Sequence, residues 1–203
     1  MFNILVLVSG SGTNLQALID AQSEGRLGGC RIAAVLSDRD GAYALERAKI
    51  AGIPAFTEKP NPALPKPERR RDLSDRILAI CREKKINILV YSGFLSILRG
   101  GIITEYSGKM INIHPALLPK FGGHGMYGKH VHEAVLAAGE TESGCTIHIV
   151  DAGTDTGPML LQRKVPVLPG DTPEILAERV LTEEHIAIVE GVKILEKKIL
   201  NLK

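Results

Sequence analysis

Residues 110–119 read MINIHPALLP, and the interpretation of the whole chain starts from this stretch. Its first five residues alternate apolar and polar side chains, the period-2 pattern of a strand with one exposed face. The alternation places Asn112 and His114 together on one face. Pro115 cannot donate a hydrogen bond to a sheet, so we expect the strand to end at His114. This pattern predicts an amide beside an imidazole at the carboxyl end of a strand, where open α/β sheets bind ligands; the alternative is a polar face that is merely solvated.

Outward from this strand, apolar runs alternate with amphipathic helical patterns. The predicted strands are 2–8, 30–37, 53–57, 86–91, 110–114, 144–150 and 159–167. One predicted helix follows the turn at 9–14, and the others cover 42–51, 72–85, 130–138 and 172–198. Residues 58–70 are rich in proline and predict a surface loop leading into the basic run 69–71. The alternation predicts one α/β domain, a doubly wound and mostly parallel sheet with a long C-terminal helix.

Composition limits the possible partners. The chain has 203 residues, of which 44% are hydrophobic and 24% charged, as is usual for a globular domain. It contains no Trp and 4% aromatic residues, so it offers no platform for stacking single-stranded nucleic acid. Its formal net charge of +2 gives no strong attraction to a polyanion. We therefore expect small-molecule substrates and no nucleic acid.

Cysteine spacing and hydropathy indicate the compartment. Cys30, Cys81 and Cys145 lie far apart without a C-x-x-C pair, which favours a reducing cytoplasm and argues against a zinc site. The apolar start at 2–8 is short and runs into a glycine-rich turn, so it is expected to be a buried strand rather than a signal peptide. No apolar run approaches the length of a membrane span, so we expect no membrane association.

The turn at 9–14, SGSGTN, joins a buried strand to a helix N-terminus, where backbone N–H groups and the helix dipole favour an anion. The turn predicts a phosphate monoester site, to which Ser11, Thr13 and Asn14 add side-chain donors. A plain helix cap is one alternative. A dinucleotide site is another, because Asp38 ends the second strand, although Leu15 occupies the place of the third fingerprint glycine.

The loop at 151–158, DAGTDTGP, offers a carboxylate for the imidazole. Such loops are usually only turns, but this one leaves a strand that could neighbour the strand of His114. A carboxylate partner raises an imidazole pKa and would keep His114 protonated. Asn112 and His114 could then both donate to an oxygen that becomes negative in a tetrahedral transition state.

The remaining histidines do not form a metal motif. His130 and His132 are two apart on a predicted helix and so point to different sides, and His124 lies in a glycine-rich loop. No H-E-x-x-H sequence is present, and we expect no catalytic metal.

Taken together, these segments resemble the phosphoribosylglycinamide formyltransferases of purine synthesis, members of the formyltetrahydrofolate-dependent formyltransferase family. The matching segments are 9–16 (SGSGTNLQ), 93–95 (GFL), 112–120 (NIHPALLPK), 144–148 (GCTIH) and 155–158 (DTGP). They occur in the family's order, and the resemblance covers nearly the whole chain.

The resemblance implies a Rossmann-like enzyme that moves the formyl group of 10-formyltetrahydrofolate, its co-substrate, to the amine of phosphoribosylglycinamide in de novo purine biosynthesis. Asn112 and His114 would stabilise the oxyanion, and Asp155 would keep His114 protonated. The implied ribonucleotide-binding residues are Ser11, Gly12, Thr13, Asn14 and Glu184. The implied folate-binding residues are Arg71, Leu95, Ser96, Ile97, Leu98, Asn112 and Asp151.

The resemblance also implies an organisation for the chain. Residues 1–203 would form one formyltransferase domain, with a phosphate-binding half at 1–90 and a folate-binding and catalytic half at 91–203, acting as a monomer or homodimer. Two features depart from the family pattern. Ser96 stands where many members carry Arg, and the loop 121–132 is longer and richer in glycine than in some members.

Related enzymes set the alternatives. Methionyl-tRNA formyltransferases carry a further C-terminal domain, and formyltetrahydrofolate hydrolases carry an extra N-terminal one, so neither is expected in a chain of this length. Single-domain sugar-nucleotide formyltransferases remain open. A non-catalytic nucleotide- or folate-binding module would be expected to lack one of Asn112, His114 and Asp155, and all three are present.

Overall fold

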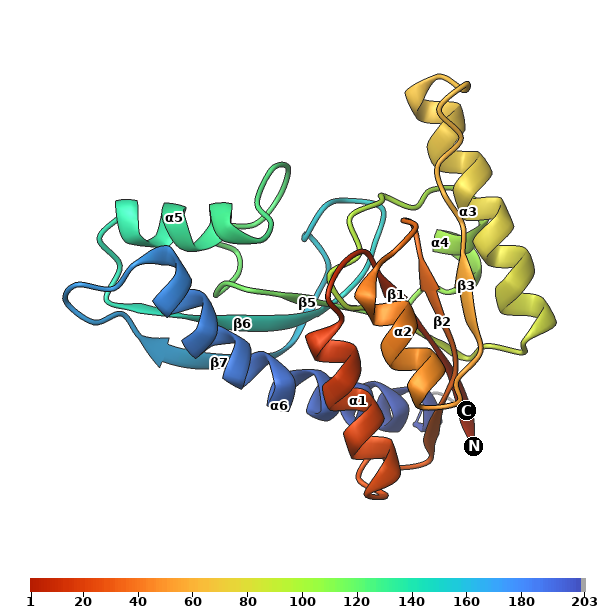
Figure 1. Ribbon diagram of the computed structural model, residues 1–203, viewed down its shortest axis with the longest axis horizontal. Coiled ribbons are helices and arrows are strands. Elements are labelled where there is room, and N and C mark those ends of the chain that lie inside the picture. The colour runs from red at the N-terminus through yellow and green to blue at the C-terminus, as the bar shows by residue number, and fades with distance from the viewer. Residues whose placement is uncertain (202–203) are drawn as a thin grey trace.

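A single seven-stranded sheet forms the centre of the computed structural model, which describes residues 1–201 (Figure 1). The strands are β1 (Phe2–Val8), β2 (Cys30–Ser37), β3 (Ala55–Thr57), β4 (Ile88–Tyr91), β5 (Met110–His114), β6 (Glu142–Ile149) and β7 (Met159–Pro166). Their order in the sheet is β3-β2-β1-β4-β5-β6-β7. The pairings among the first five strands are parallel, and β6 and β7 are antiparallel to their neighbours. The predicted mostly parallel α/β sheet is confirmed.

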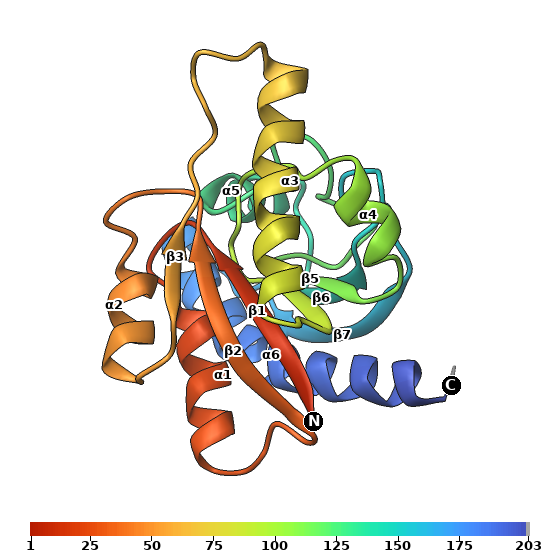
Figure 2. The same ribbon diagram turned by 90° about the vertical axis from the view of Figure 1, so that its right-hand side faces the viewer.

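Helices cover both faces of this sheet. They are α1 (Thr13–Ser23), α2 (Tyr43–Ile50), α3 (Lys66–Glu83), α4 (Gly101–Glu105), α5 (Lys129–Ala137) and α6 (Pro173–Leu200). In Figure 2, β1 and β2 run between α1 and α3. Buried residues of α1, α2, α5 and α6 share one hydrophobic cluster, and those of α3 share a second. The long C-terminal helix is confirmed.

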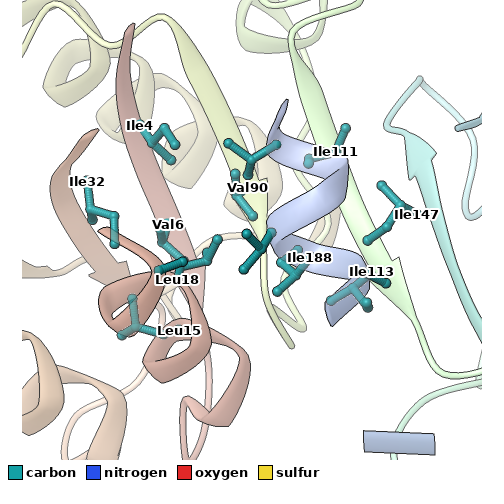
Figure 3. Packing of buried hydrophobic residues seen from close by; sticks show 14 of the residues in the cluster. Ile4, Val6, Leu15, Leu18, Ile32, Val90, Ile111, Ile113, Ile147 and Ile188 are labelled. Atoms are coloured by element: carbon teal, nitrogen blue, oxygen red, sulfur yellow. The ribbon is translucent and has the colours of Figure 1, made fainter. Parts of the chain in front are cut away.

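Strand β1 shows why the sheet must be covered on both sides. Ile4, Val6 and Val8 belong to the first cluster, whereas Leu5 and Leu7 belong to the second, and all five are fully buried. Alternate side chains of a strand point to opposite faces, so a continuously apolar strand needs helices on both. Figure 3 shows isoleucines of β5 and β6 around Ile188 of α6, and Leu15 and Leu18 of α1 beside Val6 of β1, all in the first cluster.

The strand β5 ends at His114 before Pro115, as predicted. It is not half exposed, however: every residue is buried except Asn112, which is partly exposed. The sequence pattern suggested a solvated face because a strand lining a cavity shows the same alternation as one facing water. Asn112 and His114 line a cavity, so the polar face of β5 is enclosed by protein.

Helix α3 begins at Lys66, so the basic run 69–71 lies inside it and the predicted start at Asp72 was wrong. The proline-rich loop is correspondingly shorter. Pro67 stands in the first helical turn, where its missing N–H breaks no helical hydrogen bond. The short helix α4 was not predicted.

None of the helices among residues 1–201 is both long enough and apolar enough to span a membrane. Cys30, Cys81 and Cys145 are free and buried.

Candidate active site

A cavity of about 1030 Å³ opens at the carboxyl ends of the parallel strands, between β5, the turn before α1 and the N-terminal half of α6. Most predicted site residues line it. Those in the lining are Ser11, Thr13, Asn14, Leu95, Ser96, Ile97, Leu98, Asn112, His114, Asp151, Asp155 and Glu184. Gly12 and Arg71 are not in the lining. The fold thus brings three separately predicted segments to one cavity: the turn at 9–14, the strand that carries Asn112 and His114, and the loop at 151–158.

His114 lies at the end of β5 with its side chain almost wholly buried. Its Nε2 donates to the backbone oxygen of Phe121 at 2.8 Å, and its Nδ1 lies 3.7 Å from Oδ2 of Asp155. Because a carbonyl oxygen can only accept, Nε2 carries a proton and Nδ1 faces the carboxylate. The predicted pairing of His114 with a carboxylate of the 151–158 loop is present, and Asp155 is the partner.

The charge of His114 differs from the expectation. Burial lowers its pKa below the ordinary value and outweighs the hydrogen bond to Phe121 and the charge of Asp155, which raise it. Desolvation penalises the imidazolium, and a carboxylate beyond hydrogen-bond distance compensates only in part. In the free site Asp155 therefore does not keep His114 protonated at neutral pH.

Asp155 is held by several donors. Its Oδ2 accepts from the backbone N–H of Gly123 at 2.9 Å, and its Oδ1 lies 3.4 Å from Nε2 of His148. Burial alone would raise its pKa, but the bonds from His148 and Gly123 and the neighbouring His114 lower it overall. Asp155 has a φ of 56°, a left-handed conformation that costs free energy in a non-glycine residue. The site therefore keeps an ionised carboxylate in a strained backbone position.

His148 is a member of the site that the sequence did not reveal. It pairs with Asn112 across β5 and β6, and Nδ2 of Asn112 lies 3.1 Å from its Nε2. Its Nδ1 donates to the backbone oxygen of Ile149 at 3.0 Å, and its Nε2 faces both Nδ2 of Asn112 and Oδ1 of Asp155. Period-2 alternation in β6 could have flagged His148, but only the strand register identifies Asn112 as its partner.

The turn before α1 has the form of an anion site. Gly12 caps the helix with a φ of 72°, none of the described side chains caps the first turn, and the turn contains no acidic residue. A Cβ at Gly12 would lie 2.6 Å from Cβ of Ala44, so this glycine lets the turn pack against α2 rather than lining the cavity. The open N–H groups remain available to a ligand.

Asn14 and Glu184 are 170 residues apart in sequence and meet in the cavity. Nδ2 of Asn14 donates to Oε2 of Glu184 at 2.8 Å, while Oδ1 of Asn14 has no partner among the described residues. Burial raises the pKa of Glu184 to about 7, against the opposing effect of the bond from Asn14. A carboxyl group with this pKa can donate or accept at neutral pH, which suits the binding of hydroxyl groups.

Asp151 has a different role from Asp155. Its Oδ1 accepts from the backbone N–H of Gly153 at 2.9 Å and from Oγ1 of Thr156 at 2.8 Å. These bonds hold the conformation of the loop that carries Asp155. Asp151 lines the cavity but stabilises its own loop and is not the partner of His114.

The basic residues at the start of α3 divide between the cavity and solvent. Arg71 is exposed, and its side chain passes near Gly100, outside the lining. Lys66, Arg69 and Arg70 line the cavity instead. Lys66, Arg69 and Arg70 have the i, i+3, i+4 spacing of one helix face. The predicted helix start at Asp72 left all three outside the helix, so this shared face was not recognised.

Asp38 does not offer its carboxylate to a ribose, as the dinucleotide alternative required. It is buried, and its two oxygens accept from Ser9 and Ser96. The turn at 9–14 therefore lacks the free carboxylate that a dinucleotide site would offer to the ribose.

Among the other histidines, His132 is buried in the cavity lining and has no described partner for its Nδ1. Burial lowers its pKa, and the neighbouring His114 adds to that effect. His130 is exposed and pairs with Glu133. Within residues 1–201, no group of three or more His, Cys, Asp or Glu side chains could hold a metal ion.

Comparisons with known proteins give the family. The model of the family described as "Formyl transferase" matches residues 2–192. Phosphoribosylglycinamide formyltransferase of Escherichia coli is 38% identical over 183 residues, which are 90% of this chain and 82% of that protein. The trifunctional purine biosynthetic protein adenosine-3 of Drosophila pseudoobscura is 41% identical over 95% of this chain, which spans only 14% of that relative's length.

A solved structure agrees with the sequence relatives. The crystal structure of glycinamide ribonucleotide transformylase 1 from Symbiobacterium toebii superposes with a TM-score of 0.84 at 40% identity. The match covers 95% of this chain and 86% of that one. Fold, site geometry and sequence likeness agree over nearly the whole length, and the chain belongs to the formyl transferase family.

Proposed function

We propose that this chain transfers the formyl group of 10-formyltetrahydrofolate to the amine of phosphoribosylglycinamide, a step of purine biosynthesis. The observation that carries the proposal is the junction of Asn112, His114 and Asp155 at the end of β5, in one cavity with an open helix N-terminus. A phosphate-bearing substrate and a reacting carbonyl can be held in that cavity together.

The two substrates occupy different parts of the cavity in this proposal. The ribonucleotide phosphate binds at Ser11, Thr13 and Asn14, and Glu184 binds the ribose hydroxyls. The half of the chain at 1–90 therefore supplies the phosphate site, but Glu184 reaches it from α6.

The pterin lies against the loop 95–98, where three of the four side chains are apolar. The anionic glutamate tail extends toward α3. The family resemblance assigns this contact to Arg71, but Arg70 is better placed because it lines the cavity and Arg71 does not. A guanidinium suits a carboxylate through paired hydrogen bonds.

In the reaction the amine nitrogen bonds to the formyl carbon, the bond from that carbon to the folate nitrogen breaks, and the proton lost by the amine reaches the leaving nitrogen through water. Asn112 donates to the developing oxyanion. The negative charge that develops on this oxygen joins Asp155 in favouring the imidazolium, so His114 can be charged in the transition state although it is neutral in the free site.

Acceptor identity is tested by measuring formyl transfer from 10-formyltetrahydrofolate to phosphoribosylglycinamide, to an amino-sugar nucleotide, and with no acceptor. Transfer to phosphoribosylglycinamide should dominate. Faster transfer to the amino sugar would place the chain with the sugar-nucleotide formyltransferases, and equal loss of formyl groups without acceptor would indicate a hydrolase.

We further propose that the enzyme works without a metal ion, binds no nucleic acid or membrane, and acts in the cytoplasm as a monomer or homodimer. Dialysis against EDTA should leave the rate of formyl transfer unchanged, and sedimentation velocity would give the oligomeric state.

A further inference from the structure

A buried carboxylate lies behind the loop 93–98, outside the cavity. Asp38 follows β2, and its side chain is only 4% exposed. Its Oδ1 accepts from Oγ of Ser9 and its Oδ2 accepts from Oγ of Ser96, each at 2.6 Å. Arg39 approaches Oδ1 only to 4.0 Å from an exposed position. Two serine hydroxyls therefore hold this charge within the fold.

The same group of residues holds the middle of the loop. Phe94 and Leu98 are buried and anchor its ends, while Leu95 is 42% exposed. Among residues 1–201, only two hydrogen bonds join 93–98 to the rest of the molecule. They are the bond from the backbone N–H of Leu95 to Oγ of Ser9 at 2.8 Å and the bond from Ser96 to Asp38.

Both of these hydrogen bonds depend on Asp38. Ser96 donates to it directly, and Ser9, which accepts from Leu95, itself donates to Asp38. A hydrogen bond to an ionised oxygen is roughly twice as strong as one between neutral groups, and a buried acceptor left without a donor is costly. The carboxylate thus fixes the direction of the Ser9 hydroxyl, which leaves its oxygen free to accept from Leu95. The conformation of residues 95–97 depends on a charge that never touches the cavity.

We propose that Asp38 is a positioning residue for the folate, acting through Ser9 and Ser96 to preform the loop wall against which the pterin packs. This inference rests on the proposed function, because the ligand of the loop is taken to be the folate. The hydroxyl of Ser96 donates to Asp38, so in this proposal Ser96 holds the loop in place and does not bind the folate with its hydroxyl.

Four single variants, and the double variant of Asp38→Asn with Ser96→Ala, test the proposal. Ser96→Ala removes the hydrogen bond from the loop to Asp38, Ser96→Thr keeps a hydroxyl, and Asp38→Asn removes the carboxylate charge. The matched control is Ser92→Ala. Ser92 is a buried serine immediately before the loop, and its hydroxyl has no partner among the described residues. The dissociation constant of tetrahydrofolate is measured by calorimetry, and both KM values and kcat are measured by formyl transfer.

Ser96→Ala should raise the tetrahydrofolate Kd and the formyl-folate KM about tenfold, because ordering the loop becomes part of binding. The kcat and the ribonucleotide KM should stay near wild type, since a preformed wall acts equally on ground and transition states. Asp38→Asn should have at least the same effect, with little added by combining it with Ser96→Ala. Ser96→Thr, which keeps the hydroxyl, should recover most of the folate affinity lost in Ser96→Ala, and Ser92→Ala should behave as wild type.

The proposal is overturned if Ser96→Ala matches Ser92→Ala in folate affinity, or if Ser96→Ala lowers kcat and ribonucleotide affinity equally, as general loosening would. If Asp38→Asn does not fold, the comparison of Ser96→Ala with Ser96→Thr on the partly exposed loop decides. Wild-type protein that binds no tetrahydrofolate would overturn the proposed function and this inference together, whereas normal wild-type binding without a Ser96 effect would overturn the inference alone.

Discussion

At the scale of single residues, His114 is governed by two opposing effects. Burial disfavours its charged form, and Asp155 favours it from 3.7 Å away, with burial the stronger in the free site. The family resemblance indicated Asp155 as the partner of the imidazole, but it could not indicate which of the two effects would dominate, because desolvation depends on how completely the surrounding chain excludes water.

The catalytic trio gives the prediction that belongs to this scale. Asn112→Ala and His114→Ala should each lower kcat by about 10²–10³-fold, the usual loss for an oxyanion donor. Asp155→Asn removes a charge that raises the pKa of His114, so the limb of the pH–rate profile that reports His114 should move to lower pH.

Steady-state rates from pH 5 to 9 would check this. Asp151→Asn is the matched control for the pH profile and should leave that limb in place, because the side chain of Asp151 accepts from Gly153 and Thr156 of its own loop. An Asp155→Asn enzyme with wild-type kcat and an unshifted limb would end the proposed pairing.

At the scale of elements, α6 joins the site to the sheet. It packs across β6 through Gly191, where an added Cβ would lie 2.8 Å from Cγ2 of Ile147. The absence of a side chain at Gly191 thus sets the distance between the helix and the strand that carries His148. The sequence shows only a helix of favourable pattern with a glycine inside it.

Gly191→Ala should therefore destabilise the protein, although alanine favours a helix by about 1 kcal/mol. Overpacking a core typically costs 1–3 kcal/mol, so we expect a net loss of about 1 kcal/mol and a melting temperature lower by about 2–4 °C. In an Ile147→Ala background, which removes the colliding carbons, Gly191→Ala should instead stabilise. Thermal unfolding of the four proteins checks this, and equal effects of Gly191→Ala in both backgrounds would contradict it.

At the scale of the whole molecule, Glu184 links the last helix to the first turn through Asn14. Its pKa of about 7 lies above the ordinary value of 4.5. As the pH rises between these values, the unfolded chain loses the proton while the folded protein keeps it, so the stability contribution present below pH 4.5 is lost as the pH approaches 7. At roughly 1.4 kcal/mol per pH unit the total loss is about 3 kcal/mol.

Glu184→Gln should remove this loss. Urea unfolding between pH 4.5 and 7.5 should show the wild-type free energy of unfolding falling by about 3 kcal/mol more than that of the variant. The control Glu183→Gln changes the adjacent carboxylate, which pairs with Arg163 nearer the surface, and should retain the wild-type slope. Parallel curves for wild type and Glu184→Gln would refute the assignment.

Features that depend on local periodicity could be predicted from the amino-acid sequence. The bounds of β1 and β2 follow from apolar runs, and the end of β5 at Pro115 and the placing of Asn112 beside His114 follow from alternation and from the chemistry of proline. Glycine and hydroxyl side chains at a strand-to-helix turn were equally readable. The remaining site residues were predicted from the family resemblance. Local pattern alone did not show which carboxylate pairs with His114.

Tertiary structure alone decided the features that depend on which distant segments meet. Strand register brings His148 to Asn112, and the crossing of α6 brings Glu184 to Asn14. Packing turns the apparently solvated face of β5 into a cavity wall and makes Asp38 a buried anchor rather than a ribose ligand. Burial then sets the charges of His114 and Glu184. The physical reason is that desolvation and hydrogen bonding between distant residues are properties of the assembled surroundings, and no local pattern of residues encodes them.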